Sequence, residues 1–257
     1  MNTVHVKNWS ELRDYFSKNY LDSYGHLFRG HADASWLLES TLTRLSKSVG
    51  SSFSAEVLEG KQLENFRLRI RGLRGDNPPE LKNTELWSLG QHYGLATPLL
   101  DWTDSPYIAA YFAFESVQSC SSGNRAIFVL NRSTLQDELK NTSNFDLEFI
   151  QPVKDENPRL IAQSGSFTKI PTSLSLEAWL QKNQLSQHLT KIIIPNESRL
   201  DALNELKLMN ILGTSIYPDL TGAAVACNMW LELIGGNLGS GSEPAREELL
   251  RLRERFE

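Results

Sequence analysis

The chain has 257 residues, of which 40% are hydrophobic and 22% charged, and its formal net charge is −5. This is the composition of an ordinary globular protein, at a length near the upper limit for one hydrophobic core. The negative charge disfavours a dedicated binder of duplex DNA, although a local basic patch stays open. No stretch approaches the roughly 18 apolar residues of a membrane span, and the first residues do not resemble a secretory signal. With two cysteines we expect a reducing, cytoplasmic location and no disulfide framework.

The first half of the chain alternates amphipathic helices with short apolar strands. Ser10 is a candidate helix cap, because apolar residues recur at helical spacing after it. Asp104 is a candidate cap for a later helix with Pro106 in its first turn, and the run 108–114 is apolar nearly all round, which predicts burial. In chain order we expect a helix from 10 to 20, a strand over 26–30, helices over 53–73 and 84–94, a strand over 99–102 and the buried helix to 114.

The second half contains clearer strands and ends in a charged tail. We expect strands over 126–130 and 191–194, two short strands or one bent strand over 159–170, and helices over 174–184, 196–212 and 220–234, with Gly213 closing the second of these helices. This irregular alternation predicts an α+β fold with a central mixed or antiparallel sheet flanked by helices. One domain then spans residues 1–235, a Gly/Ser linker covers 236–242, and a charged helix covers 243–257.

The first candidate site segment is Leu27-Phe28-Arg29-Gly30-His31. An arginine at the end of an apolar strand can point its guanidinium into a cleft, where its planar fork suits phosphate or carboxylate. Gly30 allows a ligand or a backbone to come close. Pairing of Arg29 with a structural carboxylate is an equally weighted alternative.

The second segment, residues 91–106, packs many polar and aromatic side chains around a buried strand and a helix N-terminus, where anions are favoured. Asp101 lies beside Trp102 on an apolar strand and must pair with something. Arg29 is the candidate partner, and we expect a hydrogen-bonded ion pair that is largely shielded from water. Caps and core packing are the alternatives for several other members. The ligand-binding candidates in this segment are His92, Tyr93, Trp102, Thr103 and Ser105.

The third segment, residues 159–167, contributes Arg159 and Gln163. Gln163 follows an apolar stretch near a glycine, and a ligand role is weighed equally with that of an edge-strand residue. Elsewhere, the histidines lack metal-ligand spacing, so we predict no metal site. Arg67, Arg71 and Arg74 share a helix face that could contact nucleic acid, but a solvated face is favoured.

The three segments together resemble the FRG-domain family. The resemblance rests on Phe28-Arg29-Gly30, on Gln91-His92-Tyr93-Gly94 and on Leu99-Leu100-Asp101-Trp102-Thr103, and it extends over about residues 20–235 through Arg159, Gln163 and Leu212-Gly213. Two positions depart from the family pattern: His31 stands where glutamine is usual, and Pro98 where arginine is frequent. The second change removes one possible phosphate contact.

This resemblance implies an ADP-ribosyltransferase-like fold, in which a small curved sheet splits around a cleft for NAD. By the likeness to ADP-ribosyltransferases, Arg29 and Gln163 are catalytic candidates, with Thr103 and Ser105 placing nicotinamide. In ADP-ribosyltransferases a catalytic glutamate stands two positions after this glutamine, but Gly165 occupies that place here, so Asp101 is the catalytic candidate for the missing acid. The resemblance therefore leaves three hypotheses. The first is transfer of ADP-ribose from NAD to a macromolecule or nucleic acid in a bacterial or phage conflict system. The second is a non-catalytic nucleotide- or nucleic-acid-binding module, and the third is a regulatory protein with a structural cleft.

Overall fold

The computed structural model describes the chain except for residues 22–23, 51, 117–119, 141–145, 152–161 and 240–257, and it describes only the backbone of 236–239. The described part contains seven strands and ten α-helices, so the α+β prediction is confirmed. The strands are β1 (Asn2–His5), β2 (His26–His31), β3 (Leu99–Thr103), β4 (Asn124–Asn131), β5 (Glu148–Ile150), β6 (Gly165–Lys169) and β7 (Leu189–Pro195). The helices are α1 (Trp9–Tyr20), α2 (Thr41–Ser48), α3 (Ala55–Arg69), α4 (Asn83–His92), α5 (Pro106–Phe114), α6 (Arg132–Lys140), α8 (Leu176–Lys182), α9 (Arg199–Leu208), α10 (Gly213–Ile216) and α11 (Leu220–Gly239).

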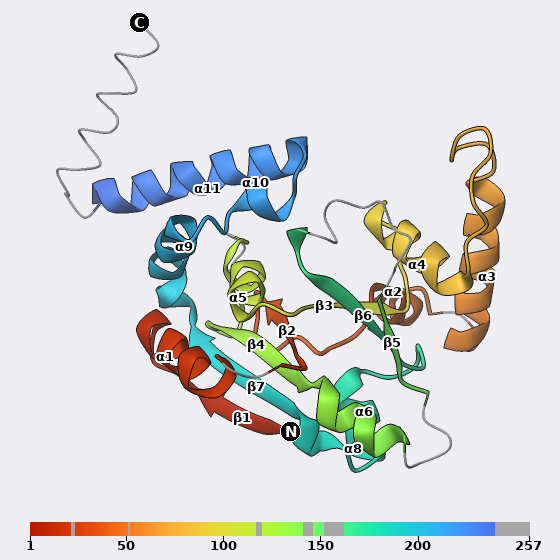
Figure 1. Ribbon diagram of the computed structural model, residues 1–257, viewed down its shortest axis with the longest axis horizontal. Coiled ribbons are helices and arrows are strands. Elements are labelled where there is room, and N and C mark those ends of the chain that lie inside the picture. The colour runs from red at the N-terminus through yellow and green to blue at the C-terminus, as the bar shows by residue number, and fades with distance from the viewer. Residues whose placement is uncertain (22–23, 51, 117–119, 141–145, 152–161, 240–257) are drawn as a thin grey trace, which may run out of the picture.

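The strands form one mixed sheet in the order β1-β7-β4-β2-β3-β6-β5, with β1 parallel to β7 and the other described pairs antiparallel (Figure 1). The sheet is nearly divided in its middle. β2 pairs with β4 along its whole length and β3 does the same with β6, but β2 meets β3 at a single pair, Phe28 opposite Thr103. The sheet therefore consists of a larger half-sheet, β1-β7-β4-β2, and a smaller half-sheet, β3-β6-β5, which diverge from that pair.

Apolar clusters cover both faces of the larger half-sheet. One cluster joins β2, β4 and β7 to α1, α5, α9 and α11, and the other joins the opposite face to α6 and α8. A smaller cluster holds α2 and α4 against β3 and β6. No helix among the described residues is both long and apolar enough to cross a membrane.

Helix α5 lies at the centre of the first cluster, as its uniformly apolar sequence predicts. Ala109 and Ala113 have no exposed surface, and the α5 backbone packs directly on β2. A Cβ atom added to Gly30 would lie 1.9 Å from the Ala109 carbonyl oxygen and 2.6 Å from the Ala113 nitrogen. Gly30 is therefore required for close approach of a helix backbone, which is one of the two uses that the sequence left open.

Two arginines fix the C-terminal end of α5. Arg125, which is 1% exposed, donates to the carbonyl oxygens of Ala113 and Ser116, and Arg199 donates to those of Phe114 and Glu115. The last carbonyls of a helix have no partner within it and carry partial negative charge, so buried guanidinium groups suit this position. They tie α5 to β4 and α9.

Several helix ends differ from the sequence prediction. Helix α1 is capped by Asn8, whose side chain accepts from the Glu11 amide, rather than by Ser10, and α5 is capped by Ser105 rather than Asp104. Gly213 does not end α9. Asn210, with φ of 60°, follows the end of α9 in the left-handed region where asparagine is tolerated.

Gly213 instead begins α10. Glycine is needed at this position because a Cβ there would lie 2.5 Å from the Gly222 carbonyl oxygen. Helix α11 continues to Gly239, so residues 236–239 are helical where a linker was expected. Extending a packed helix costs only about 1 kcal/mol per glycine. The charged C-terminal helix expected over 243–257 lies outside the described residues.

The contact between Gly30 and α5 generates a matched pair of substitutions. Gly30→Ala should destabilise the protein by more than about 3 kcal/mol, because neither backbone can move away without disturbing the core. Gly60→Ala is the control: it lies in α3 with nothing within 4 Å of the added Cβ, and should stabilise by about 0.5–1 kcal/mol. Urea unfolding of both variants measures the difference. Equal stabilities would contradict the proposed packing role.

Candidate functional site

A pocket of about 400 Å³ opens where the half-sheets diverge. Its walls come from β2, β3, α4, α5, β6 and the segments around Gln163 and Tyr217. Arg29, His92, Asp101 and Gln163, four of the candidate residues named from the sequence, all line it. The complete lining is Phe28, Arg29, Gly30, Ser88, Gln91, His92, Asp101, Trp102, Thr103, Phe112, Gln163, Phe167 and Tyr217.

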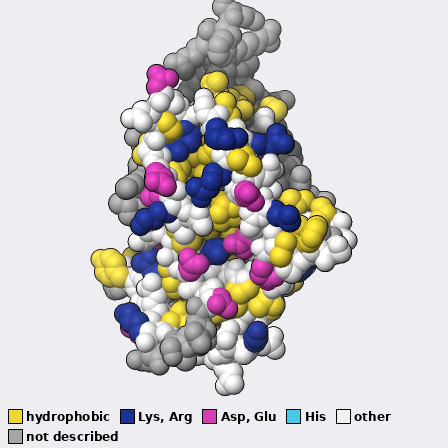
Figure 2. Space-filling view, turned by 90° about the vertical axis from the view of Figure 1, so that its right-hand side faces the viewer, with side chains coloured by type: hydrophobic (Ala, Val, Ile, Leu, Met, Phe, Trp, Pro, Cys, Tyr) yellow, Lys and Arg dark blue, Asp and Glu magenta, His cyan; other side chains and the backbone are white. Residues whose placement is uncertain are grey.

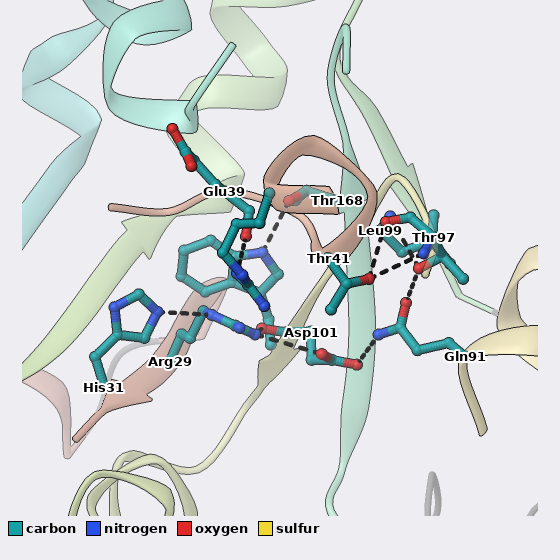
Figure 3. Close-up of polar contacts among 11 residues, drawn as sticks. Arg29, His31, Glu39, Thr41, Gln91, Thr97, Leu99, Asp101 and Thr168 are labelled. Atoms are coloured by element: carbon teal, nitrogen blue, oxygen red, sulfur yellow. Dashed lines mark hydrogen bonds and ion pairs between the residues drawn. The ribbon is translucent and has the colours of Figure 1, made fainter. Parts of the chain in front are cut away.

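Arg29 crosses the divide between the half-sheets. Its Nη1 donates to the backbone carbonyl oxygen of Asp101 at 2.7 Å, and its Nε donates to Nε2 of His31 at 3.1 Å (Figure 3). The guanidinium thus takes the place of a ladder hydrogen bond that β2 and β3 do not make here. The third nitrogen, Nη2, has no partner among the described residues, and the side chain is 20% exposed.

The predicted ion pair between Arg29 and Asp101 is present, but it is not shielded from water. The Asp101 carboxylate lies 3.4 Å from Nη1 of Arg29 and is 57% exposed. Asp101 is opposite Phe167 of β6 on the smaller half-sheet, close to the divide, so its side chain reaches solvent as well as the pocket. An exposed pair of this kind contributes about 0–1 kcal/mol. The expectation of a buried carboxylate is therefore wrong.

A chain of side-chain hydrogen bonds orients the Asp101 carboxylate. The Gln91 amide donates to Oδ1 of Asp101, and the amide oxygen of Gln91 accepts from the Thr97 hydroxyl (Figure 3). The Thr97 amide in turn donates to the hydroxyl of Thr41 at 2.9 Å. These bonds connect β3 to α4 and α2, which pack on the smaller half-sheet, while Arg29 reaches the carboxylate from β2.

His31 stays neutral beside this arginine. Burial, followed by the charge of Arg29, lowers the pKa of His31 to about 3. Since its Nε2 accepts from Arg29, the ring proton is on Nδ1. His31 therefore helps to orient Arg29 without adding charge.

The part of the lining from Phe112, Gln163 and Tyr217 consists of neutral groups. Gln163 donates to the Ile216 carbonyl oxygen at 3.3 Å, which ties the segment before β6 to α10. The Tyr217 ring meets Phe112 edge to face, with centroids 6.2 Å apart, and its hydroxyl donates to the Glu115 carboxylate at 3.0 Å. Burial raises the pKa of Glu115, while the hydrogen bond from Tyr217 acts in the opposite direction. The pocket lining thus combines aromatic rings with the ion pair of Arg29 and Asp101.

Two predicted ligand-binding residues do not line the pocket. Tyr93 follows the last residue of α4 and is 76% exposed, so its ring lies against water. Ser105 accepts from the Ile108 amide as the cap of α5, which was its structural alternative. Arg159 lies outside the described residues.

Trp102 and Thr103 line the pocket mainly as structural residues. The Trp102 indole is 3% exposed and donates to the Thr168 hydroxyl at 2.9 Å within a core cluster. The Thr103 hydroxyl oxygen accepts from the Ser105 amide at 3.1 Å and is 2% exposed. It keeps a hydrogen that it can donate into the pocket.

Sequence reasoning missed part of the lining. Gln91 lines the pocket but is not among the candidates named from the sequence. Its position next to His92, at the end of the same helix, is a usable signal. Phe112 was read as core only, and Tyr217 carries no local signal because α10 brings it to the pocket from far along the chain.

The lining suits a ligand with an anionic group and a flat ring. Among the described lining residues, Arg29 is the one permanent cation and Asp101 the one carboxylate. No group of three or more His, Cys, Asp or Glu in the described residues is placed to hold a metal ion. A pocket of about 300–1,000 Å³ is the usual size for small ligands.

The basic residues around the end of α3 form a separate surface. Because α3 ends at Arg69, Arg67 lies in the helix while Arg71 and Arg74 follow it, so the expected shared helix face is not present. The guanidinium of Arg67 donates to Asn83, and that of Arg74 donates to the Pro79 carbonyl. Viewed from the α3 side, Lys and Arg side chains alternate with Asp and Glu around apolar surface (Figure 2). Such alternation is more typical of a solvated face than of a phosphate track.

Comparison with protein families gives a match for residues 25–121, to the family model described as FRG domain. The match includes β2 and the segment from Gln91 to Ser105, but ends before Gln163 and Tyr217. No curated protein and no solved structure matches the chain. The family resemblance is thus confirmed over the first two motif segments, which contribute most of the polar side chains of the pocket.

The bond between Arg29 and the Asp101 backbone predicts unequal effects of two substitutions. Arg29→Ala should destabilise by about 1–3 kcal/mol, because it removes a charged donor that joins the half-sheets. Asp101→Ala should cost less than about 1 kcal/mol, since the backbone acceptor remains and the lost pair is exposed. Thermal melting of both variants measures this. If the order were reversed, the ion pair and not the backbone bond would hold the divide.

The raised pKa of Glu115 predicts a pH dependence of stability. The folded protein holds this proton to higher pH than the unfolded chain, so Glu115 contributes stability below its ordinary pKa of about 4.3 that is lost as pH rises through the folded value. Glu115→Gln keeps an oxygen for the Tyr217 hydroxyl and removes the titration. The variant should therefore gain stability relative to wild type as pH rises above about 4.3, as urea titrations at a series of pH values would measure. A difference independent of pH would mean that folding leaves this pKa unchanged.

Proposed function

This chain contains an FRG domain, and we propose that its pocket binds a nucleotide, with NAD as the candidate, in an ADP-ribosyltransferase-like architecture. One observation carries the proposal. The pocket lies at the single-pair junction of two half-sheets, where Arg29 of the first strand of the FRG match lines it together with the rings of Phe112 and Tyr217. A split sheet with an arginine at the edge of the split is the arrangement that the family resemblance implies.

The groups around the pocket suit the parts of such a ligand. The Nη2 of Arg29, which bonds to none of the residues that the structure describes, offers donors for a phosphate or a ribose hydroxyl. Phe112 and Tyr217 offer an apolar surface for a ring. The amide oxygen of Gln163 has no partner among the described residues and can accept from a carboxamide or hydroxyl.

Transfer of ADP-ribose would use Asp101 as the carboxylate. The bond between ribose C1′ and nicotinamide breaks, and its electron pair leaves with nicotinamide. The lone pair of an acceptor nucleophile then forms the new bond to C1′, and the acceptor's proton passes to a base, for which Asp101 is available. Positive charge builds on the ribose in between, and a nearby carboxylate stabilises it. Gly165 offers no side chain at the position where the resemblance places a glutamate.

Asp101 is also partly neutralised by Arg29 and held by Gln91. We therefore expect slow turnover or a specialised macromolecular or nucleic-acid acceptor in a bacterial or phage conflict system. The same contacts support the alternative, a module that binds a nucleotide without catalysis.

Calorimetric titration with NAD, combined with assay of released nicotinamide, tests the proposal. We expect binding by the wild type, and slow release in the presence of a cell lysate as a source of acceptor. Asp101→Asn keeps the shape and the acceptor for Gln91, so affinity should change by less than about threefold while release falls about 100-fold or more. Binding without release in either protein would favour the non-catalytic module. Absence of NAD and adenine-nucleotide binding would overturn the proposal.

A further inference from the structure

Helix α11 is apolar on two faces, and one of them is exposed. Its inner face contributes Met229 and Leu233 to the cluster around α5, where both side chains are buried. The helix itself lies at the edge of the molecule, next to α9 and α10 (Figure 1). On its outer face Leu231 is 66% exposed, and Ala224 and Cys227 are exposed as well. A helix that is apolar all round is normally buried, so the outer face lacks cover among the described residues.

The exposed residues of the outer face form a regular stripe. Leu220, Ala224, Cys227 and Leu231 follow one another at intervals of four, three and four residues, which keeps them on one side of the helix. Isolated exposed leucines are ordinary on a protein surface. A continuous stripe opposite a buried face is instead the pattern of a helix that packs between two partners. We call these four residues the α11 stripe.

The segment that follows α11 carries the same pattern. In residues 243–257, Ala245, Leu249, Leu252 and Phe256 repeat the intervals of four, three and four, so a helix over this segment has one apolar stripe. Most of its other residues are Glu and Arg, which suit solvent. A helix this short is marginal in water by itself and needs a surface on which to pack.

The connection between the two stripes suits an antiparallel pair of helices. Helix α11 ends at Gly239, and residues 240–242 then lead to the segment 243–257. Connections of about 2–8 residues are usual between antiparallel helices. A short flexible linker also gives the segment an effective concentration on the order of millimolar beside the α11 stripe. A second copy of the chain would have to reach that concentration in solution to compete, so the tethered segment is favoured.

The length of the segment matches the length of the stripe. A helix over residues 243–257 is about 22 Å long, and it would extend from the end of α11 back to about Ala224. In this register Leu252 lies over Leu231, and the large ring of Phe256 lies over the smaller side chain of Cys227.

The charges of the two helices are also compatible with this contact. The one charged residue of α11, Glu232, is already paired with Arg199 at 2.6 Å. Covering the α11 stripe therefore removes no unpaired charge from water. We propose that residues 243–257 form a helix that folds back on α11 and covers its stripe. This docking is independent of the function proposed for the pocket.

Maleimide labelling of Cys227 in the full chain, measured by mass spectrometry of the digested protein, tests the docking. The docked segment protects Cys227, so Leu252→Asp and Phe256→Asp, which place a charge in the contact, should raise its labelling rate at least about fivefold. Leu250→Asp is the matched control, because it places the same charge off the stripe of the same helix, and it should leave the rate unchanged. Labelling of Cys120 in the same digest shows that the fold is intact and should be equal in all the proteins.

A substitution on the other side of the contact extends the test. Leu231→Asp should expose Cys227 as the two variants of the segment do, although it leaves residues 243–257 unchanged. Light scattering at the labelling concentration should give the mass of a monomer. Protection of Cys227 that appears only in a dimer would assign the stripe to a second copy and overturn the proposal. Labelling as fast in wild type as in Phe256→Asp would overturn it too, because Cys227 would then be uncovered.

Discussion

One backbone pair, Phe28 opposite Thr103, joins the two half-sheets, and the rest of the site depends on it. Had β2 and β3 paired along their length, as β2 does with β4, the ladder would occupy the space that the pocket now takes. Arg29 bridges the divide with a side chain instead, and its bond to the Asp101 carbonyl fixes how far the strands separate. Gly30 supports this arrangement from one side, because α5 can rest on β2 only where no Cβ intervenes.

The polar network around Asp101 combines rigidity with access. Gln91, Thr97 and Thr41 hold the carboxylate from α4 and α2, yet more than half of the Asp101 side chain is exposed. A group held in this way can meet a ligand without first breaking a buried ion pair, which would be costly. Tyr217 and Gln163 depend on α10 for their positions. The pocket therefore combines these later segments with Arg29 of β2, which lies far earlier in the chain.

The sequence was most informative where a residue type admits few explanations. The all-apolar run of α5, the glycine after Arg29 and the polar cluster around Asp101 each indicated burial, close approach or a site. The sequence was least informative where strand pairing and contacts between distant segments decide whether a side chain is exposed or lines the pocket. The exposure of Asp101 follows from the position of β3 beside the divide, and the entry of Tyr217 follows from α10. Helix α2 and strand β1 were missed because short segments depend on tertiary contacts more than on their own pattern.

The strand order has a consequence for the sequence of events in folding. β1 pairs with β7, at Asn2 opposite Thr190, so 188 positions separate the two partners of that pair. On a ribosome, β1 would wait until β7 has been synthesised before its partner appears. The smaller half-sheet closes earlier, between β3 and β6. Because pairings between distant segments slow folding, nascent chains would hold β1 as an unpaired edge for longer than any other strand of this sheet.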